Sequence, residues 1–442
     1  MQAAVGEFQA VRRGRIRLSA MISPAALRRR PAPIDRAADR TVALAAIGLA
    51  VGFLVAALLA TLLPASVRRG AWLPLHLGVA GGATTAIAGV MPFFSAAFAG
   101  APPIDARLRS AAVAGVSLGA LAVALAVVGG QPGVAAAGGV VFLAGIALTG
   151  LATVRPLGRG LGPGRGLITR AYVVALCEVA VGASVAIVFL AGWPPLVEGW
   201  GQARPAHAWL NLFGFVSLVI ATTLLHFFPT VVGARIAVRP SARATVAGLA
   251  AGAPIVALGI ALQSDLIARV GAACVLVGAM GLAAYAARTW QTRARWTTDP
   301  DWHRFAIVGL VSAIAWFEIA SAIAAGRVLV SGSRPTSWSL EAVAGPLLAG
   351  WVGLAVIASA THLVPAVGPG DPPAHARQRA LLGRFATPRL VVTNVGVAVL
   401  AVGLPLHLEG LVTAGVALLA TGLGLSAILL ASAMRIGIHR RP

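Results

Sequence analysis

The chain has 442 residues, of which 58% are hydrophobic and only 11% are charged, and its mean hydropathy is +0.88. A soluble domain of this length would carry about a quarter charged residues, so the composition argues against a soluble protein. The formal net charge of +22 comes from basic residues in loops between apolar blocks. We attribute it to membrane topology and expect no nucleic-acid partner.

The first 40 residues are rich in arginine and lack the short apolar core of a signal peptide. We expect residues 1–40 to form a disordered cytoplasmic arm next to anionic lipid, with Met21 as an alternative start. Twelve apolar blocks follow, each near the roughly 20 residues that cross a bilayer. Because a backbone in lipid must satisfy its own hydrogen bonds, we predict an all-α membrane domain over residues 41–434 and a cytoplasmic tail over 435–442. The predicted spans are 41–65, 71–99, 108–129, 133–153, 169–192, 205–232, 242–262, 266–288, 303–326, 341–366, 389–405 and 410–434.

The arginines divide unevenly between the two sides of these spans. The N-terminus, the loops after even-numbered spans and the C-terminus hold 29 of them, and the loops after odd-numbered spans hold 6. Positively charged loops stay in the cytoplasm. We therefore predict a multi-pass plasma-membrane protein with both termini in the cytoplasm.

Three segments resemble one another at the ends of the second, sixth and tenth spans. The sequences TAIAGVMPFFSAAFAG, ATTLLHFFPTVVGARI and IASATHLVPAVGPG contain Pro92, Pro229 and Pro365, which are 137 and 136 residues apart. The segment 177–180 likewise matches 317–320, so that Glu178 aligns with Glu318. Self-similarity at a fixed period indicates a repeated structural unit. We predict three four-helix units in parallel, since an even number of spans preserves orientation.

Seven polar side chains inside the spans are candidates for function, because a polar group at membrane depth is costly to bury. The predicted topology separates the histidines. His76 and His207 lie near the outer face, and His226 and His362 lie near the cytoplasmic face. The 19 residues from His207 to His226 span roughly 28 Å of helix, so one site cannot hold all four. The candidates are His76, His207, Asn211, His226, His362, Glu178 and Glu318.

The outer pair, His76 and His207, combines imidazole with small or polar neighbours. Glycines follow His76, where another helix or a flat cofactor can approach closely, and Asn211 stands one turn after His207 on the same face. Neutral imidazole ligates both haem iron and copper. Alternatively, both histidines belong to the interfacial aromatic belt with Trp72 and Trp209.

The inner pair, His226 and His362, occupies equivalent repeat positions, three residues before a repeat proline. Equivalent positions on equivalent helices are expected to face a shared axis, where two imidazoles could also hold haem iron or copper. Gly89 takes the third equivalent position. The alternative is that both histidines cap helix ends.

Glu178 and Glu318 lie near the middle of their spans. They are candidates for proton relay or for orienting a histidine, and the alternative is a hydrogen bond to a neighbouring helix. The sequence contains no HExxH, GxSxG, Walker or CxxC motif, so no catalytic signature of a soluble hydrolase, ATPase or thiol oxidoreductase is present.

The segments LPLHLGVAGGATTAI and AHAWLNLFGFVSLVIATTLLHFFPTVVGARI resemble the membrane region that precedes nitrite-reductase-like cupredoxin domains of actinobacterial copper oxidases. More distantly, they resemble subunit I of the haem-copper oxidases and the NnrS-type membrane proteins, a superfamily with twelve helices in three four-helix arcs. The resemblance implies that His76 takes the place of a haem ligand and His207 that of a copper ligand. This sequence departs from the pattern, because 242–262 has no His-His pair and 341–366 has no His-x-His. A complete oxygen-reducing centre is therefore not expected.

Three hypotheses follow for the function. The first is a haem- or copper-binding membrane redox protein, in electron transfer or in nitric oxide or copper handling, with a cupredoxin or cytochrome as electron partner at the outer face. The second is a proton-coupled transporter or channel in which Glu178 and Glu318 carry protons. The third is a metal-free assembly subunit.

Overall fold

The computed structural model describes residues 37–101, 104–156, 166–295, 299–368 and 370–438. Within these ranges, twelve helices are long and apolar enough to cross a membrane, and their bounds match the predicted spans to within a few residues. The prediction of an all-α polytopic membrane protein is confirmed. The predicted arm lies almost entirely outside the described residues. The twelve helices are Arg40–Ala60, Trp72–Phe98, Ala106–Val128, Pro132–Val154, Gly166–Leu190, Trp200–Val232, Pro240–Ala261, Asp265–Gln291, Pro300–Ser331, Pro335–Val367, Ala386–Gly403 and Glu409–Ile436.

The helices form three repeats with one plan: a long first helix, a second helix that contains a π-helical segment, and a closing pair of helices. The first repeat comprises α3 (Ala37–Ala60), α4 (Ala65–Arg68), α5 (Trp72–His76), η1 (Leu77–Ala83), α6 (Thr84–Phe98), α7 (Ala106–Val128) and α8 (Pro132–Val154). The second comprises α9 (Gly166–Leu190), α10 (Pro194–Glu198), α11 (Trp200–Trp209), η3 (Leu210–Ser217), α12 (Leu218–Val232), α13 (Pro240–Ala261) and α14 (Asp265–Gln291). The third comprises α15 (Pro300–Ser331), η4 (Pro335–Ser337), α16 (Leu340–Val343), η5 (Ala344–Gly353), α17 (Leu354–Val367), α18 (Pro372–Leu382), α19 (Ala386–Gly403) and α20 (Glu409–Ile438), which continues into the predicted tail.

The π-helical segments are the clearest structural sign of the repeat. The segments η1, η3 and η5 occupy the same place in the three repeats, and the prolines Pro92, Pro229 and Pro365 follow them inside α6, α12 and α17. The predicted correspondence of the three prolines is thus confirmed. π-Helical turns are rare and occur mostly at functional sites, so these segments mark where a site should be sought.

The closing hairpins repeat as well, down to their turns. A residue with positive φ follows α7, α13 and α19: Gly130 (68°), Gln263 (53°) and His407 (53°). At each turn, the next residue donates its N–H to a carbonyl of the preceding helix, as Gln131 does to Ala126 at 2.8 Å. This left-handed conformation ends a helix and reverses the chain. His407 is accordingly a turn residue.

Glycines allow the two helices of a hairpin to pack backbone against backbone. A Cβ on Gly145 of α8 would collide with the backbone of Val116 on α7, and a Cβ on Gly278 of α14 would collide with that of Leu249 on α13. In lipid, helix association relies on such close packing, because lipid tails are as apolar as the side chains. The hairpins therefore depend on residues that no hydropathy pattern selects.

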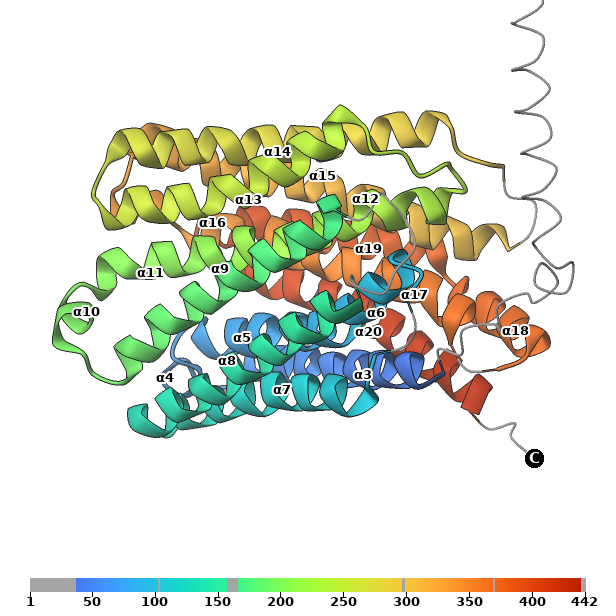
Figure 1. Cartoon of the computed structure of the whole chain (residues 1–442), viewed down its shortest axis with the longest axis horizontal. Coiled ribbons are helices and arrows are strands. Elements are labelled where there is room, and N and C mark those ends of the chain that lie inside the picture. The colour runs from blue at the N-terminus through green and yellow to red at the C-terminus, as the bar shows by residue number, and fades with distance from the viewer. Residues whose placement is uncertain (1–36, 102–103, 157–165, 296–298, 369, 439–442) are drawn as a thin grey trace, which may run out of the picture. The chain divides into compact units, whose positions relative to one another are not determined.

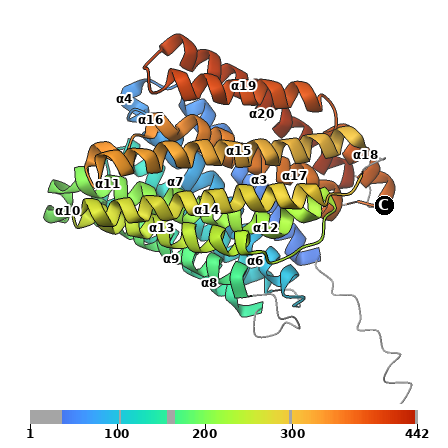
Figure 2. The same cartoon turned by 90° about the horizontal axis from the view of Figure 1, so that it is seen from above.

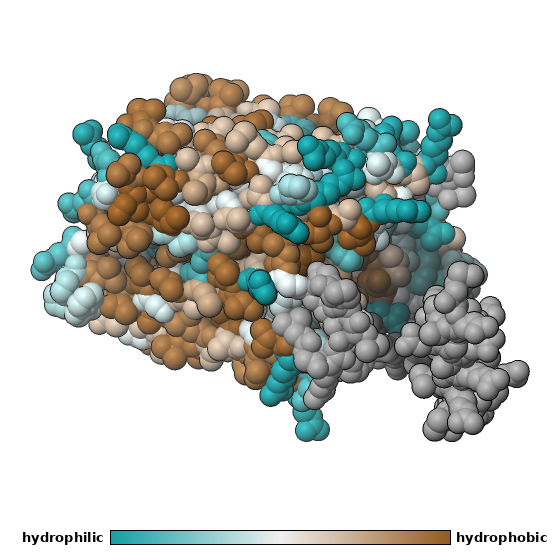
Figure 3. All heavy atoms as spheres, turned by 45° about the horizontal axis from the view of Figure 1, so that its top comes forward, coloured by the Kyte–Doolittle hydropathy of each residue, from teal (hydrophilic) through white to brown (hydrophobic). Residues whose placement is uncertain are grey.

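The helices run side by side, with the connections gathered at the two ends of the bundle (Figure 1). The helix α3 begins and α20 ends at the same end, as expected for an even number of spans. Seen from above, α19 and α20 form one edge of the bundle, and α8 and α9 lie toward the opposite edge (Figure 2). Hydrophobic side chains cover the middle of the visible face, and hydrophilic ones gather toward its ends (Figure 3). This distribution is that of a protein surrounded by lipid.

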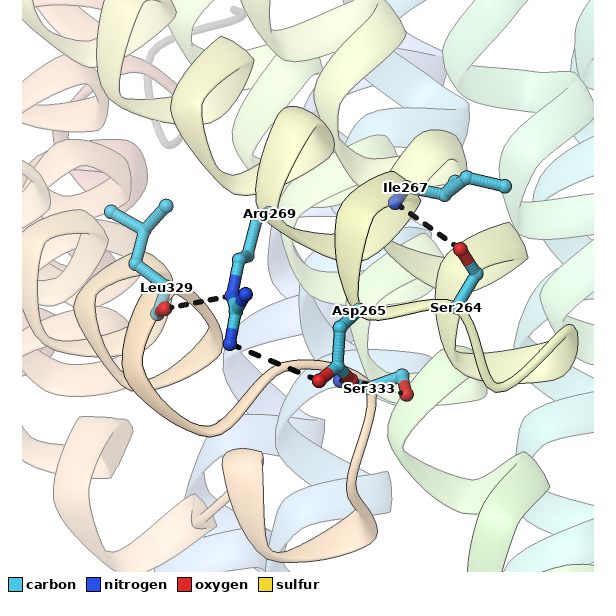
Figure 4. Close-up of polar contacts among 6 residues, drawn as sticks. All are labelled: Ser264, Asp265, Ile267, Arg269, Leu329 and Ser333. Atoms are coloured by element: carbon cyan, nitrogen blue, oxygen red, sulfur yellow. Dashed lines mark hydrogen bonds and ion pairs between the residues drawn. The ribbon is translucent and has the colours of Figure 1, made fainter.

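A polar clasp joins the start of α14 to the end of α15 (Figure 4). The Asp265 carboxylate accepts hydrogen bonds from the backbone N–H and the hydroxyl of Ser333, both at 2.9 Å. Arg269 donates to the Leu329 carbonyl at 3.1 Å and lies 3.8 Å from Asp265. The clasp lies at the predicted outer end of the bundle.

Gln202 connects this end to α11. Its side-chain amide donates to the carbonyls of Ile260 at 2.7 Å and Ser333 at 3.2 Å. Because α11 carries His207, these bonds fix the helix that positions this candidate ligand.

Candidate functional site

His76 ends α5, directly before η1. Its Nδ1 lies 2.8 Å from the Trp72 carbonyl, and its ring stacks on the Trp72 indole with centroids 4.1 Å apart and planes at 24°. A carbonyl can only accept a hydrogen bond, so Nδ1 carries the proton and Nε2 keeps its lone pair. Within the described residues, Nε2 has no hydrogen-bond partner. A ligating histidine typically has this arrangement.

His207 on α11 has the same arrangement, with a partner from another helix. Its Nδ1 lies 2.8 Å from the Gly182 carbonyl of α9. The Asn211 amide donates to the His207 carbonyl at 2.6 Å and lies 3.3 Å from Nδ1. Nδ1 therefore carries the proton here too, and Nε2 is free to accept or to bind a metal ion.

The two outer histidines come together across repeats. The half-buried rings of His76 and His207 are close enough to interact electrostatically. Two neutral imidazoles, each with Nδ1 on a carbonyl and a free Nε2, form a donor set that fits copper or haem iron. The described part of the chain contains no group of three or more His, Cys, Asp or Glu side chains suited to a metal ion.

The glycines after His76 admit a helix. A Cβ added at Gly81 would meet the Phe53 ring of α3, and one at Gly82 would meet Leu54. Of the two alternatives for this glycine-rich stretch, the close approach of another helix is the one found on these two glycines.

The inner histidines stack on different aromatic partners. The His226 ring lies 3.9 Å from that of Phe98. The His362 ring stacks on Trp302 at 5.0 Å with planes at 8°, and its edge meets Phe227 at 5.6 Å. This packing satisfies the apolar surface of both rings without a shared ligand.

The third position equivalent to these histidines has no room for a side chain. A Cβ on Gly89 would collide with the Cβ of Ala46 on α3, and the Gly89 carbonyl accepts a hydrogen bond from the buried Arg109 at 2.9 Å. The threefold ligand arrangement suggested by the repeat is therefore incomplete.

The two glutamates lie in different surroundings. Glu178 of α9 is 5% exposed, and its carboxyl rests on Gly214 of η3. Within the described residues, neither carboxyl oxygen of Glu178 has a hydrogen-bond partner. Glu318 of α15 is half-buried, and only its Oε1 is buried without a partner in the described chain.

The structural equivalence corrects the sequence alignment of these glutamates. In the third repeat, Trp316 packs on Gly350 of η5, as Glu178 packs on Gly214. In the first repeat, Phe53 packs on Gly81 of η1. Glu178 therefore corresponds in space to Phe53 and Trp316, and Glu318 lies two residues beyond the equivalent position.

Two glycines were missed as site residues. Gly182 supplies the carbonyl for His207, and the Asn211 amide packs where its Cβ would be; Gly214 makes room for the Glu178 carboxyl. The available signal was spacing, because Gly182 follows Glu178 by one turn and Gly214 follows Asn211 by one turn.

A large aromatic cluster fills the space between the π-helical segments. Trp209 stacks on Phe213 at 4.5 Å, and Phe317 stacks on Trp351 at 4.5 Å. The Trp351 indole donates to the Ser217 hydroxyl at 3.1 Å. All four aromatic rings are buried, so they form the packed floor beneath the outer histidines.

Comparison with protein-family models gives no match, and neither does comparison with curated proteins. Among solved structures, the chain is similar to a haem-copper terminal oxidase dimer determined by cryo-electron microscopy. The TM-score is 0.61 and the identity is 15%, over 90% of this chain and 84% of that chain. The resemblance in fold to the haem-copper oxidases is thereby confirmed.

Proposed function

We propose that the chain is an integral membrane redox protein that binds copper or haem through His76 and His207, with Asn211 holding His207 in place. The observation that carries the proposal is the shared arrangement of the two imidazoles, each with Nδ1 on a carbonyl and Nε2 free. Carbonyl partners of this kind fix the tautomer and the orientation of ligating histidines.

A bound copper or haem iron would supply one-electron redox chemistry. The protein's part is to hold two neutral imidazoles at a half-buried position near the predicted outer end. A cupredoxin or cytochrome is the fitting electron partner for a site at that face. Electron transfer, or nitric oxide or copper handling, fits two histidine ligands better than oxygen reduction does.

The inner pair has a structural role in this proposal. His226 and His362 pack on Phe98 and Trp302, respectively. Removing either imidazole should weaken aromatic packing and leave the outer site intact.

The test is the cofactor content of the purified protein in detergent, measured by Soret absorbance and copper analysis. We expect His76→Ala and His207→Ala each to lose the cofactor and His226→Ala to keep it. One shared ion gives one metal per chain and metal–nitrogen bonds near 2 Å by X-ray absorption, whereas separate haem and copper centres give one of each. A preparation that has no haem and fails to bind added copper would contradict the proposal and favour a transporter.

A further inference from the structure

We propose that Glu178 is the balancing carboxylate of the outer histidine site: it is a neutral acid in the metal-free protein and releases its proton when a divalent cation binds at His76 and His207. This inference rests on the proposed function.

The first argument is the internal comparison of the repeats. The first helix of each repeat presses one side chain onto a glycine of the neighbouring π-helical segment. This side chain is Phe53 in α3, Trp316 in α15 and Glu178 in α9. The fold is therefore satisfied by an apolar ring at this position. A carboxyl in the second repeat alone is not needed for packing, so it calls for a functional reason.

The second argument is the burial of this carboxyl. Glu178 is 5% exposed, and neither of its oxygens has a hydrogen-bond partner in the described chain. An ionised carboxylate in such a place costs several kcal/mol unless a positive charge faces it. With nothing bound, the group is therefore held as the neutral acid.

The third argument is the position of Glu178 relative to the histidines. Glu178 and Gly182 lie one turn apart on the same face of α9, roughly 6 Å along the axis. Gly182 accepts the His207 hydrogen bond, and Gly214, which faces Glu178, lies one turn beyond Asn211. The carboxyl therefore lies directly below the His207 side of the site.

Other ionisable groups on this part of the fold are farther away or belong to helix ends. His207 is the nearest imidazole along the axis, and Tyr172 lies six residues toward the other end of α9, where its hydroxyl bonds Thr223 at 2.8 Å. The remaining ionisable groups on α9 and the helices packed against it are Arg170, Cys177, Arg204, His226 and Arg243.

The chemistry is an ion-for-proton exchange without a redox step. The Glu178 O–H bond breaks, the proton leaves to solvent, and the electron pair stays on the carboxylate. A site of two neutral imidazoles with a divalent cation then carries a net charge of one instead of two. Coulombic attraction over this distance inside a protein makes the cation bind more tightly.

The experiment uses the purified full chain, freed of metal by a chelator and titrated with Cu²⁺ alone. Calorimetry in two buffers of different protonation enthalpy gives the protons released per ion. Infrared difference spectra follow the C=O band of a protonated carboxylic acid. We expect the wild type to release about one proton per ion and to lose this band. Loss of a supporting carboxylate typically weakens metal binding by about tenfold or more, so Glu178→Gln should bind Cu²⁺ that much more weakly and release about one proton fewer.

Glu318→Gln is the matched control and should behave as the wild type does, because its carboxyl lies on another helix away from the histidines. The band lost from the wild type provides a second measurement should Glu178→Gln fail to fold. Copper binding that depends on both histidines, with unchanged proton release in Glu178→Gln or with no band lost from the wild type, would overturn this inference. Absence of histidine-dependent binding in the wild type would instead overturn the proposed function.

Discussion

Replacing Glu178 with methionine should stabilise the metal-free protein. Methionine keeps the length of the side chain and removes two carboxyl oxygens that have no hydrogen-bond partner in the described chain. A buried polar group without a partner costs about 1–3 kcal/mol, and the equivalent positions hold the apolar rings of Phe53 and Trp316. We therefore expect the free energy of unfolding to rise by about 1–3 kcal/mol.

The measurement is equilibrium unfolding in mixed micelles with increasing dodecyl sulfate, followed by the fluorescence of the ten tryptophans. Glu318→Met is the matched control, and its gain should be smaller because Glu318 is half-buried and only one of its oxygens is buried without a partner. A loss of stability in Glu178→Met would refute the reasoning, since it would mean that the carboxyl makes favourable contacts in the metal-free protein. Such a gain on removal of a polar group is the usual sign that a residue serves function at the expense of stability.

Three further predictions concern the fold. A reporter fused after residue 442, or inserted in the loop that carries His375, should be active only in the cytoplasm, and activity on the outer side would contradict the arginine-based topology. Gly145→Val should destabilise the α7–α8 hairpin by about 1–3 kcal/mol in the same unfolding assay, because its Cβ would meet the backbone of the facing helix; Gly133→Val, in open space on α8, should have little effect, and equal effects would contradict the packing. Arg389→Met should lower the free energy of unfolding by about 2–3 kcal/mol, because the buried guanidinium bonds the Ser426 hydroxyl at 3.2 Å; a neutral result would show that this bond contributes nothing.

The sequence determined the membrane class, the number of helices and the repeat. Hydropathy fixes span positions because lipid leaves the backbone no alternative to helix. The recurring prolines Pro92, Pro229 and Pro365 were enough to define a four-helix period, which the three π-helical segments then matched. The outer position of His76 and His207 relative to His226 and His362 also followed from helix direction alone.

Tertiary structure alone decided which polar groups meet. Sequence similarity aligned Glu178 with Glu318, but packing on the π-helical glycines relates Glu178 to Trp316, because π turns shift the register between neighbouring helices. The Gly182 carbonyl that orients His207 carries no sequence signature, since every residue has a carbonyl. The separation of His226 from His362 depends on where the rings of Phe98 and Trp302 lie. Such contacts between helices are set by packing geometry, whereas the positions of the spans are set by the solvent that surrounds each helix.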